Sequence, residues 1–456
     1  MTPIRVGLLG IGTVGSGTFN VLQRNQAEIT RRAGRGIEIT MVADLDTARA
    51  KAVVRDLGLQ DSVRVVADAR EVIANTEIDI VVELIGGYGI ARTLVLEAIA
   101  AGKHVVTANK ALLAVHGTEI FAAARDKGVV VAFEAAVAGG IPIIKALREG
   151  LTANRIEWIA GIINGTTNFI LSEMRAKGLD FGVVLKQAQA LGYAEADPTF
   201  DIEGVDAAHK LTLMSAIAFG IPVQFDRAHV EGITQLQAAD ITYAEHLGYR
   251  IKLLGITKRT KGLTNSPSGS EGIELRVHPT LVPAKRLIAN VEGAMNAVVV
   301  HGDAVGSTLY YGKGAGSEPT ASAVIADLVD ITRLHSADPQ HRVPHLAFQH
   351  DALSATPILP MEATVTAYYL RLQVADEAGV LARIAGILAE HRISIDALLQ
   401  RPNDGSTADG APTAHTDVII LTHDTVEADM NRAIAQMQAL PTVLASIVRI
   451  RKEELS

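Results

Sequence analysis

The sequence predicts an α/β protein with several domains, and three observations support this fold class. An apolar run at residues 4–9 leads into a glycine-rich turn and then into a helical pattern. Apolar runs alternate with helical segments as far as residue 134, which predicts an N-terminal Rossmann-type, doubly wound parallel sheet. After residue 361, strand and helix patterns follow one another in the order βαββαβ, the ferredoxin-like arrangement.

The length and composition of the chain limit the classes of protein to which it can belong. Its 456 residues are enough for two or three domains with real cores. A formal charge of −8, few aromatic residues and the lack of a basic stripe argue against a nucleic-acid partner. Without cysteine there is no disulfide, thiolate metal site or cysteine nucleophile. We expect a cytoplasmic protein, because the N-terminus lacks a secretory pattern and no apolar stretch reaches the ~18–20 residues of a membrane span.

A six-residue turn follows the first apolar run and begins the next helical segment. Its residues are Gly10, Ile11, Gly12, Thr13, Val14 and Gly15. The first glycine allows a tight turn, the second lets the backbone approach a pyrophosphate, and the third lets helix and strand pack closely. We therefore expect these residues to bind a dinucleotide, either NAD or NADP. A glycine-rich turn without a ligand is the alternative interpretation.

The second strand, at residues 37–42, ends close to Asp44. An acidic residue at this place usually binds the ribose hydroxyls of the cofactor. The interval from the glycines exceeds the usual ~20 residues, and the polar stretch 24–35 accounts for it as an extended helix or loop. Asp44 would repel the 2′-phosphate of NADP, whereas Arg49 and Lys51 could accept it, so both cofactors stay open. The alternative role for Asp44 is that of a helix cap.

Strands at residues 78–85, 104–107 and 129–133 continue the alternation, with a helix at 91–101 between the first two. Ligands of doubly wound sheets bind beyond the carboxyl ends of the strands. Lys110 comes directly after such a strand end, so we expect it to face the cofactor cleft. An ordinary surface lysine at the start of a helix is the alternative.

The run from Glu195 to Lys210 is the most informative stretch of the chain. It holds one lysine and five carboxylates: Glu195, Asp197, Asp201, Glu203 and Asp206. Asp206 and Lys210 are four residues apart at the start of an apolar helical pattern, so they share a helix face. Such a patch suits a substrate that carries an ammonium group, and the amine suits proton delivery to an oxygen. The alternative is a solvated acidic loop with an ordinary surface ion pair.

Further motifs follow in a characteristic order. They are Thr107-Ala-Asn-Lys110, residues 134–142, Gly161-Ile-Ile-Asn-Gly-Thr-Thr-Asn168, and Gly192-Tyr-Ala-Glu195 continuing to Lys210. Together with the glycine turn they resemble the motifs of the homoserine dehydrogenases, over roughly residues 4–345. The resemblance implies that the chain reduces L-aspartate 4-semialdehyde to L-homoserine with NADH or NADPH, on the route to threonine and methionine.

The resemblance also implies roles for individual residues. Lys210 would be the proton donor and Lys110 a second lysine at the reacting centre. Gly192, Glu195 and Asp206 would hold the substrate. Gly316, in a later glycine-rich turn, would contact the cofactor. A sodium ion would be held near Glu134, Val137, Gly139 and Ile141, largely through backbone oxygens, as hard cations prefer. A buried structural turn is the alternative for this last segment, and Gly316 could serve only its own turn.

We expect four parts in the chain. A dinucleotide-binding domain spans 1–134, with the helix 320–334 packing back on it, and a central α+β substrate-binding and dimerisation domain spans 135–319. A linker covers 335–360, and its histidines, His335, His341, His345 and His350, lack a convincing metal-ligand spacing. Residues 361–456 form the fourth part. Residues 258–272 are predicted as a hairpin loop and 401–415 as a long loop.

The run from Asp376 to Leu381 resembles an ACT domain, a small amino-acid-sensing module. The resemblance implies an effector near Gly379, for which we expect threonine feedback, and a homo-oligomer. A dimerisation module without a ligand is the alternative. For the whole chain, the rival functions are a related amino-acid dehydrogenase acting on another substrate and a catalytically silent amino-acid sensor.

Overall fold

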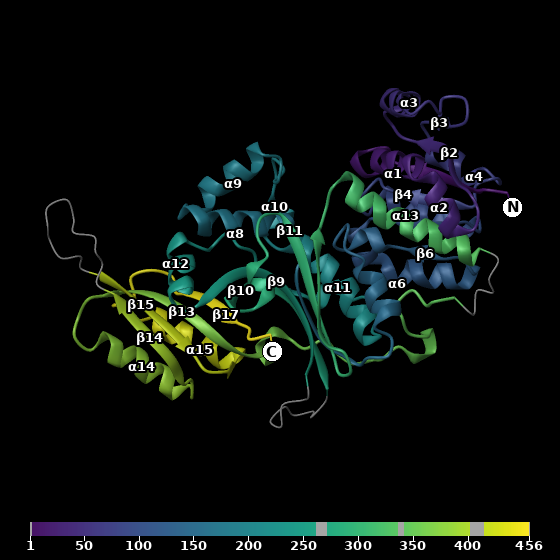
Figure 1. Cartoon of the computed structure of the whole chain (residues 1–456). Coiled ribbons are helices and arrows are strands. Elements are labelled where there is room, and N and C mark those ends of the chain that lie inside the picture. Colours follow the sequence, from purple (N-terminus) through teal and green to yellow (C-terminus); the bar gives the residue numbers. More distant parts are fainter. Residues whose placement is uncertain (1, 261–270, 336–341, 402–414, 456) are drawn as a thin grey trace. The chain divides into compact units, whose positions relative to one another are not determined.

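The computed structural model describes residues 2–260, 271–335, 342–401 and 415–455. The chain forms two compact units (Figure 1). Unit 1 comprises Met1–Gly165, Asp206–Ala228 and Met295–Thr356, and unit 2 comprises Thr166–Val205, His229–Ala294 and Pro357–Ser456. In the described ranges, no helix is both long enough and apolar enough to cross a membrane.

Unit 1 contains the predicted doubly wound sheet. Its strands are β1 (Ile4–Leu9), β2 (Ile37–Ala43), β3 (Arg64–Val66), β4 (Ile80–Glu83), β5 (His104–Thr107) and β6 (Val131–Ala132). They are ordered β3-β2-β1-β4-β5-β6, and every neighbouring pair is parallel. From β1 the chain adds β2 and β3 on one side of the sheet, and it then continues with β4, β5 and β6 on the other side. Sheets of this kind bind ligands where the strand order reverses, here between β1 and β4. The Rossmann-type prediction is confirmed.

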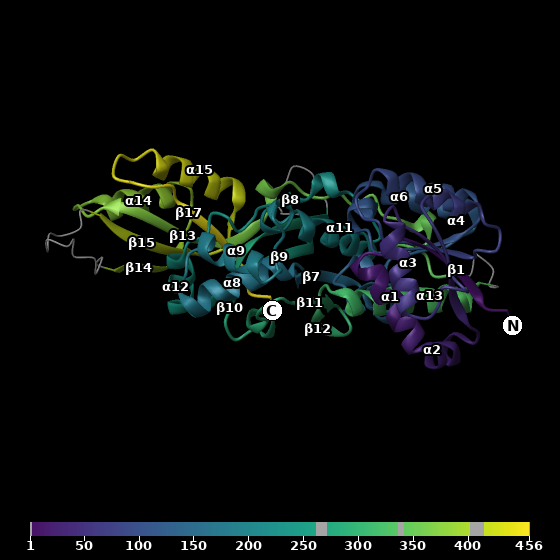
Figure 2. The same cartoon turned by 90° about the horizontal axis from the view of Figure 1, so that it is seen from above.

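Helices cover both faces of this sheet (Figure 2). One face carries α1 (Thr13–Arg24), α2 (Gln26–Ala33) and α13 (Ser317–Leu334), and the other carries α4 (Ala69–Ala74), α5 (Ile90–Ala100) and α6 (Lys110–Lys127). A further helix, α3 (Thr47–Asp56), follows β2. The late helix α13 packs along α1, and its Ala321, Val324 and Leu328 belong to the same apolar core as β1 and β2.

The rest of unit 1 positions a fully buried helix. Strands β7 (Ile156–Ile162), β11 (Met295–Gly302) and β12 (Gly306–Lys313) pair antiparallel in the order β7-β11-β12. The helix α11 (Val205–Phe219) is apolar almost all round, and each residue from Asp206 to Phe219 is buried. Its few charged groups are therefore buried with it, which is costly unless they are paired.

Unit 2 holds the acidic run and a second set of strands. Strands β9 (Tyr249–Thr260) and β10 (Gly272–Pro283) pair antiparallel along their whole length, and β8 (His229–Val230) joins β10. The helices are α8 (Gly165–Lys177), α9 (Phe181–Ala190), α10 (Thr199–Ile202) and α12 (Ala238–His246). The hairpin loop was predicted too long, because residues 258–260 and Gly272 still pair in β9 and β10, and residues 261–270 lie outside the described residues.

The C-terminal module has the predicted ferredoxin-like fold. Its elements are β13 (Val365–Ala375), α14 (Val380–Glu390), β14 (Ile395–Arg401), β15 (His415–Thr422), α15 (Glu427–Gln438) and β17 (Val448–Lys452). The strands are ordered β17-β13-β15-β14 and pair antiparallel. Both helices lie on one face of the sheet (Figure 2), where their apolar residues form one core with it. A two-residue strand, β16 (Thr425–Val426), pairs with β13.

Some boundaries differ from the sequence prediction. The stretch 24–35 is neither one long helix nor a loop, since α2 is a separate helix that ends at Gly34 in the left-handed conformation. The last strand starts at Val448 rather than Val443, because the residues between them turn back after α15. Most of the predicted loop 401–415 lies outside the described residues.

The histidines predicted as linker residues have different environments. The Nε2 of His345 accepts a hydrogen bond from the Val131 amide at 3.1 Å, and its ring stacks on Phe121. His335 lies edge-on to His104, while His350 begins a short 3-10 turn. His341 lies outside the described residues.

Candidate active site

The glycine turn lies between β1 and α1, at the carboxyl end of a central strand. Gly10 has a φ of +93°, and a β-carbon there would lie 2.9 Å from the Leu84 oxygen. A β-carbon on Gly15 would lie 2.3 Å from the Gly10 oxygen, whereas one on Gly12 would meet no atom within 4 Å. No side chain of the described residues caps the N-terminus of α1. The turn thus offers open space and uncapped helix amides to a phosphate, so it fits a dinucleotide.

Asp44 lies one residue after β2, and its carboxylate binds the glycine turn. Its Oδ2 accepts from the Ile11 amide at 2.8 Å and from Arg49 Nη2 at 3.2 Å, while its Oδ1 accepts from the Asp46 amide. Burial raises the pKa of Asp44, but these hydrogen bonds and the Arg49 charge outweigh it and hold the pKa below the ordinary value. The helix-cap alternative is wrong, because Asp46 caps α3.

Two lysines from separate helices meet one carboxylate in unit 1. Lys210 Nζ donates to Asp206 Oδ2 at 2.6 Å and to the Ile163 oxygen at 2.9 Å. Lys110 Nζ lies 3.5 Å from Asp206 Oδ1, and Asn164 Nδ2 donates to Asp206 Oδ2 at 2.8 Å. The Lys210 and Asp206 side chains are only 11% and 5% exposed. The alternative of an ordinary surface ion pair is therefore wrong.

The electrostatics of this cluster favour an incoming anion or a polarised oxygen. Burial raises the pKa of Asp206, but the charges of Lys210 and Lys110 and the Asn164 hydrogen bond outweigh it and lower the pKa to about 2. Asp206 is therefore ionised at neutral pH and offsets one of the two ammonium charges. The Lys110 side chain is 37% exposed, so the remaining positive charge is accessible.

A chain of hydrogen bonds fixes the start of α6, where Lys110 lies. The buried Glu83 carboxylate accepts from the Ile85 and Gly86 amides and from Thr107 Oγ1 at 2.7 Å. Thr107 Oγ1 accepts in turn from the Asn109 amide. Asn109 caps α6 and also donates to the Gly87 oxygen. The ends of β4 and β5 are thus tied together beneath Lys110.

The other two predicted substrate residues belong to unit 2. Gly192 follows α9 and has a φ of +77°, which an L side chain rarely adopts. The Glu195 backbone oxygen accepts from Gln189 Nε2 at 3.0 Å. Close to it, the carboxylate of Asp197 accepts from both the amide and the hydroxyl of Thr199.

The predicted cation segment is a tight turn in unit 1. The buried Glu134 carboxylate accepts from the Ile144 and Lys145 amides, and its own amide donates to Asp327. Burial is the main cause that raises the pKa of Glu134, and burial together with the Glu134 charge raises that of Asp327 to about 7. Since the Glu134 carboxylate already accepts hydrogen bonds from two backbone amides, it is poorly suited to ligate an ion directly.

Backbone oxygens of the same turn suit a cation better. Ala138 and Gly139 both have positive φ values, 56° and 50°, and a β-carbon on Gly139 would lie 2.5 Å from the Gly314 oxygen. Val137 and Ile141 flank this pair. Among the described residues, no group of three or more histidine or carboxylate side chains could hold a metal. A site in this turn would therefore depend on carbonyl oxygens.

Gly316 lies where α13 approaches the glycine turn. It precedes α13 with φ 122° and ψ 159°, a conformation nearly restricted to glycine. Ser317 Oγ then donates to the Thr13 oxygen at 2.8 Å, and Arg24 and Glu318 form a two-point ion pair. A β-carbon on Gly17 would lie 2.4 Å from Ser317 Oγ, so α1 and α13 approach closely.

Three residues of the candidate site received no role from the sequence: Asn164, Glu83 and Asn109. Asn164 belongs to one of the motifs, but no role was predicted for it. Its hydrogen bond to Asp206 joins residues that are 42 positions apart in the sequence, so it depends on the tertiary fold. Glu83 gave a usable signal, because a charged residue inside an apolar strand must find buried partners. Asn109 gave another, since asparagine is a preferred N-cap and precedes Lys110.

The structure combines an uncapped helix at a glycine turn, an acid after the second strand, and a carboxylate that faces one buried and one partly exposed lysine. Together these features define a class of protein. They are the parts of a nucleotide-dependent dehydrogenase, in which a cofactor carries hydride and the protein handles the proton. Comparison with known proteins identifies the family.

Family profiles match three segments of the chain. The profile described as "Homoserine dehydrogenase, NAD binding domain" matches residues 10–134, "Homoserine dehydrogenase" matches 142–329, and "ACT domain" matches 368–442. A homoserine dehydrogenase of Pseudomonas aeruginosa is 61% identical over 456 residues and 100% of both chains.

Solved structures agree with these matches. The crystal structure of a homoserine dehydrogenase from Thiobacillus denitrificans has a TM-score of 0.92 and 64% identity, covering 100% of this chain and 99% of that one. A hyperthermophilic archaeal homoserine dehydrogenase mutant in complex with NADPH has a TM-score of 0.60 and 25% identity, covering 74% of this chain and 99% of that one.

The chain belongs to the homoserine dehydrogenase family. It is an oxidoreductase with an N-terminal NAD-binding domain and a C-terminal ACT domain. The predictions of family, fold class and enzyme class are therefore confirmed.

Proposed function

We propose that Lys210 protonates the carbonyl oxygen of L-aspartate 4-semialdehyde in the homoserine dehydrogenase reaction, and takes the proton back when L-homoserine is oxidised. A bound nicotinamide supplies the hydride to the carbonyl carbon. The observation that carries the proposal is the buried hydrogen bond between Lys210 and Asp206, at 2.6 Å. The contact of Asp206 with Lys110, which begins α6 after β5, supports a position of this ammonium near the carboxyl end of a Rossmann strand.

The hydrogen bonds of Lys210 support this role. An ammonium has three N–H donors, and two of them are engaged by Asp206 and by the Ile163 oxygen. The third can donate to a substrate oxygen. Because a lysine is protonated at neutral pH, donation in the reduction direction needs no prior change of protonation.

Asp206 and Lys110 complete the reacting centre in this proposal. The family resemblance makes Asp206 a substrate-binding residue, and its contacts support a further role in positioning both lysines. Lys110, being partly exposed, would meet the substrate oxygen or carboxylate from the cofactor side. The pair of ammonium groups would stabilise negative charge that develops on the carbonyl oxygen.

Gly192 and Glu195 are proposed to hold the amino-acid end of the substrate. The Glu195 side chain is exposed, and a carboxylate suits the substrate ammonium. The left-handed Gly192 would let the backbone approach the same group without a side chain in the way.

For the cofactor we propose that residues 10–15 cradle the pyrophosphate, that Asp44 binds the ribose, and that Lys110 and Gly316 lie beside the bound nucleotide. Arg49 is proposed to bind the 2′-phosphate of NADP. The solved archaeal relative in complex with NADPH supports NADP as one cofactor, while the ionised Asp44 favours NAD. We therefore propose that both cofactors are used.

We further propose a sodium ion at the turn of Glu134, Val137, Gly139 and Ile141, bound through backbone oxygens. Its role would be to fix the turn rather than to take part in the reaction. The test is the thermal midpoint of the protein in sodium chloride against choline chloride at equal ionic strength. A sodium-specific rise is expected, and equal midpoints would contradict the proposal.

Regulation and assembly extend the proposal. We propose that the ACT domain binds an amino-acid effector near Gly379, with threonine as the first candidate, and that the protein is a cytoplasmic homo-oligomer. The domain boundaries 1–134, 135–319, 335–360 and 361–456 are part of this proposal. Activity titrated with L-threonine tests the effector, since insensitivity would remove it.

The test of the central proposal is Lys210→Ala, with the exposed Lys186→Ala on α9 as the matched control. Lys210→Ala should lower kcat by about 100-fold or more, the usual contribution of a general acid. NADPH binding, followed by fluorescence titration, should stay unchanged in both variants. Retained turnover in Lys210→Ala would contradict the proposal.

The pH profile gives an independent readout. Oxidation of L-homoserine needs the neutral amine, so its rate should rise toward alkaline pH and this rise should be lost in Lys210→Ala. A flat profile in the native protein from about pH 7 to about pH 10 would argue against Lys210. Assaying L-homoserine against L-aspartate in the same buffers separates this function from that of a related amino-acid dehydrogenase.

A further inference from the structure

The two lysines that face Asp206 are oriented in different ways. Lys210 Nζ donates two hydrogen bonds of its own, to Asp206 at 2.6 Å and to the Ile163 oxygen at 2.9 Å. Lys110 Nζ lies 3.5 Å from Asp206 Oδ1, which is longer than an ordinary hydrogen bond, and its side chain is 37% exposed. The place of the Lys110 ammonium therefore depends on how the backbone is held at the start of α6.

The N-cap of α6, Asn109, is fixed through all four of its hydrogen-bonding groups. Its backbone amide donates to Thr107 Oγ1, and its backbone oxygen accepts from the Leu113 amide. Its side-chain oxygen accepts from the Leu112 amide, and its side-chain nitrogen donates to the Gly87 oxygen. The start of α6 is thus tied both to the strand before it and to the loop that follows β4.

These contacts lead to Glu83, at the carboxyl end of β4. Its Oε2 accepts from Thr107 Oγ1 at 2.7 Å, and its Oε1 accepts from the Ile85 and Gly86 amides at 2.8 and 3.1 Å. Glu83 and Thr107 are both 0% exposed. A carboxylate is costly to bury, and hydrogen bonds from neutral donors offset part of that cost. We therefore looked for a function that needs the carboxylate at this place.

The hydrogen bonds around Glu83 close into a ring. In order, its members are Glu83, Thr107, Asn109, Gly87 and Gly86. An ionised carboxylate can only accept, so the Thr107 hydroxyl donates to it and keeps its oxygen for the Asn109 amide. Gly86 and Gly87 have φ values of +82° and +68°, which let the loop turn back toward α6. The ring therefore has a fixed direction that depends on the carboxylate.

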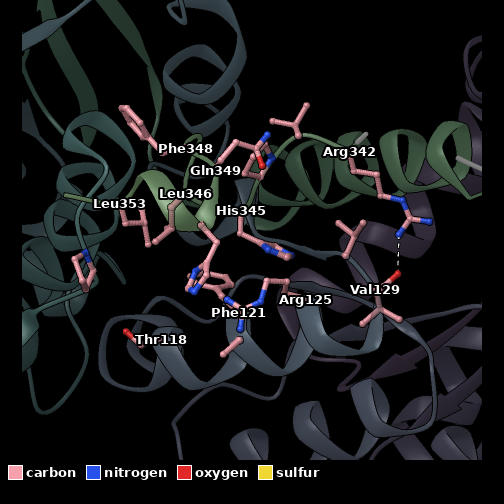
Figure 3. A pocket seen from close by; sticks show the side chains of 17 residues that line it. Thr118, Phe121, Arg125, Val129, Arg342, His345, Leu346, Phe348, Gln349 and Leu353 are labelled. Atoms are coloured by element: carbon pink, nitrogen blue, oxygen red, sulfur yellow. Dashed lines mark hydrogen bonds between the residues drawn. The ribbon is translucent and has the colours of Figure 1, made fainter. Parts of the chain in front are cut away.

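The C-terminal end of α6 is held by different contacts. Phe121 stacks on His345 with ring centroids 5.3 Å apart, and Arg342 donates to the oxygen of Gly128, the C-cap of α6 (Figure 3). These residues line a cavity of about 760 Å³, whose described lining shares no residue with the ring or with the lysine cluster. Loss of a contact at this end should lower stability and leave the start of α6 in place.

We infer that Glu83 and Thr107 are positioning residues of the dehydrogenase reaction. Acting through Asn109, they hold Lys110 where its ammonium faces Asp206. The inference rests on the proposed role of Lys110 at the reacting centre. When Lys110 is misplaced, the negative charge that develops on the substrate oxygen loses one of its two ammonium groups.

Two variants of Thr107 test the inference. Valine matches the shape of threonine without its hydroxyl, whereas serine keeps the hydroxyl. Thr107→Val should lower kcat for L-homoserine about 10- to 100-fold, because small misplacements of reacting groups cost this much. Thr107→Ser should retain turnover close to that of the native protein. Native kcat in Thr107→Val, or an equal loss in both variants, would overturn the inference.

Phe121→Leu, at the other end of α6, is the matched structural control. It should lower the midpoint of thermal unfolding and leave kcat unchanged. A loss of kcat as large as that in Thr107→Val would assign both effects to general destabilisation and overturn the inference.

Glu83→Gln changes the direction of the ring. Its side-chain amide would donate to Thr107 Oγ1, so the hydroxyl proton would lose its acceptor. The variant should lower kcat in the same range as Thr107→Val, and native kcat would overturn the role of the carboxylate. If Glu83→Gln fails to fold, the two Thr107 variants still decide.

A double-mutant cycle shows whether Thr107 acts through Lys110. Lys110→Ala should lower kcat, and the addition of Thr107→Val should lower it no further. Two additive losses would place the action of Thr107 elsewhere and overturn the inference. Native kcat in Lys110→Ala would contradict the proposed role of Lys110 and this inference with it. A loss in Lys110→Ala with native kcat in Thr107→Val would overturn this inference alone.

Discussion

Two buried ion clusters, one in each unit, show how differently charges can be placed in a core. In unit 1, Asp206 faces the ammonium groups of Lys210 and Lys110, so two cations share one carboxylate. In unit 2, Arg451 donates to both Glu231 and Glu427, with Arg449 beside the same two carboxylates. The first cluster has an excess positive charge, whereas the second is balanced.

The geometry differs as well as the charge. Each terminal guanidinium nitrogen of Arg451 contacts a carboxylate, the residue is 1% exposed, and Tyr368 donates to Glu427. Such a closed, multidentate arrangement has little capacity left for a ligand. Lys110 instead remains partly exposed next to its carboxylate. Excess charge with an open donor marks a reacting site, and a balanced arginine cluster marks a structural one.

The largest effect is expected from a variant that removes Arg451 from the structural cluster of unit 2. Arg451→Met should destabilise the protein by about 3–5 kcal/mol, because it leaves the buried Glu427 carboxylate and the partly buried Glu231 carboxylate without their main partner. The midpoint of thermal unfolding measures the loss. Arg432→Met is the matched control, since the exposed Arg432–Asp429 pair should contribute less than about 1 kcal/mol. Equal midpoints for the two variants would remove the structural role.

The next largest effect is expected on turnover, from a variant that removes the carboxylate of Asp206 from the lysine cluster of unit 1. Asp206→Asn should lower kcat about 100-fold, because Lys210 and Lys110 lose the group that positions them. Asp197→Asn, an exposed carboxylate from the same acidic run, should leave kcat unchanged. Steady-state kinetics with NADPH measure both variants. Normal turnover in Asp206→Asn would show that the lysines do not depend on this carboxylate.

A pH titration of stability sharpens the comparison. The pKa of Asp206 is about 2 in the folded protein and about 4 when unfolded. Because the folded pKa is the lower one, its stabilising contribution is complete above pH 4 and is lost as the pH falls toward 2. The expected loss is about 2 kcal/mol. Circular dichroism of urea unfolding should show this loss in the native protein and not in Asp206→Asn; parallel curves would contradict the assignment.

The smallest effect concerns the cofactor. Arg49→Ala should raise the KM for NADPH about 10-fold by removing one charged hydrogen bond to the 2′-phosphate. The KM for NADH should not change, since that cofactor lacks the phosphate. Arg55→Ala, on the same helix and more exposed than Arg49, is the control. A similar rise for both cofactors would assign Arg49 a role in fixing Asp44 instead.

Periodic features of the chain were predictable from its sequence. The alternation of strands and helices gave the Rossmann sheet, and the βαββαβ order gave the C-terminal module. The spacing of Asp206 and Lys210 placed them on one helix face, as their 2.6 Å contact shows. These features depend on local spacing, which the sequence contains directly.

Contacts that depend on the tertiary fold were not predictable. The approach of Lys110 to Asp206 joins helices from distant parts of the chain. Apolar residues can also be misleading: Val443 and Ile447 pack on the core of the C-terminal module before β17 begins, so the strand was predicted to start at Val443. Elements such as β3, with three residues, and α4, with six, are too short to show a periodicity and were missed for that reason.

The uncapped start of α1 has a consequence for the lifetime of the protein. A helix that leaves its first amides unpaired is least stable there, and a bound phosphate supplies the partner that a serine or aspartate would otherwise provide. By mass action, a cofactor present at about 100 times its Kd would add about 2.7 kcal/mol to the folded state. The supply of nucleotide in the cell would then govern not only how fast this enzyme turns over but also how long each copy survives degradation.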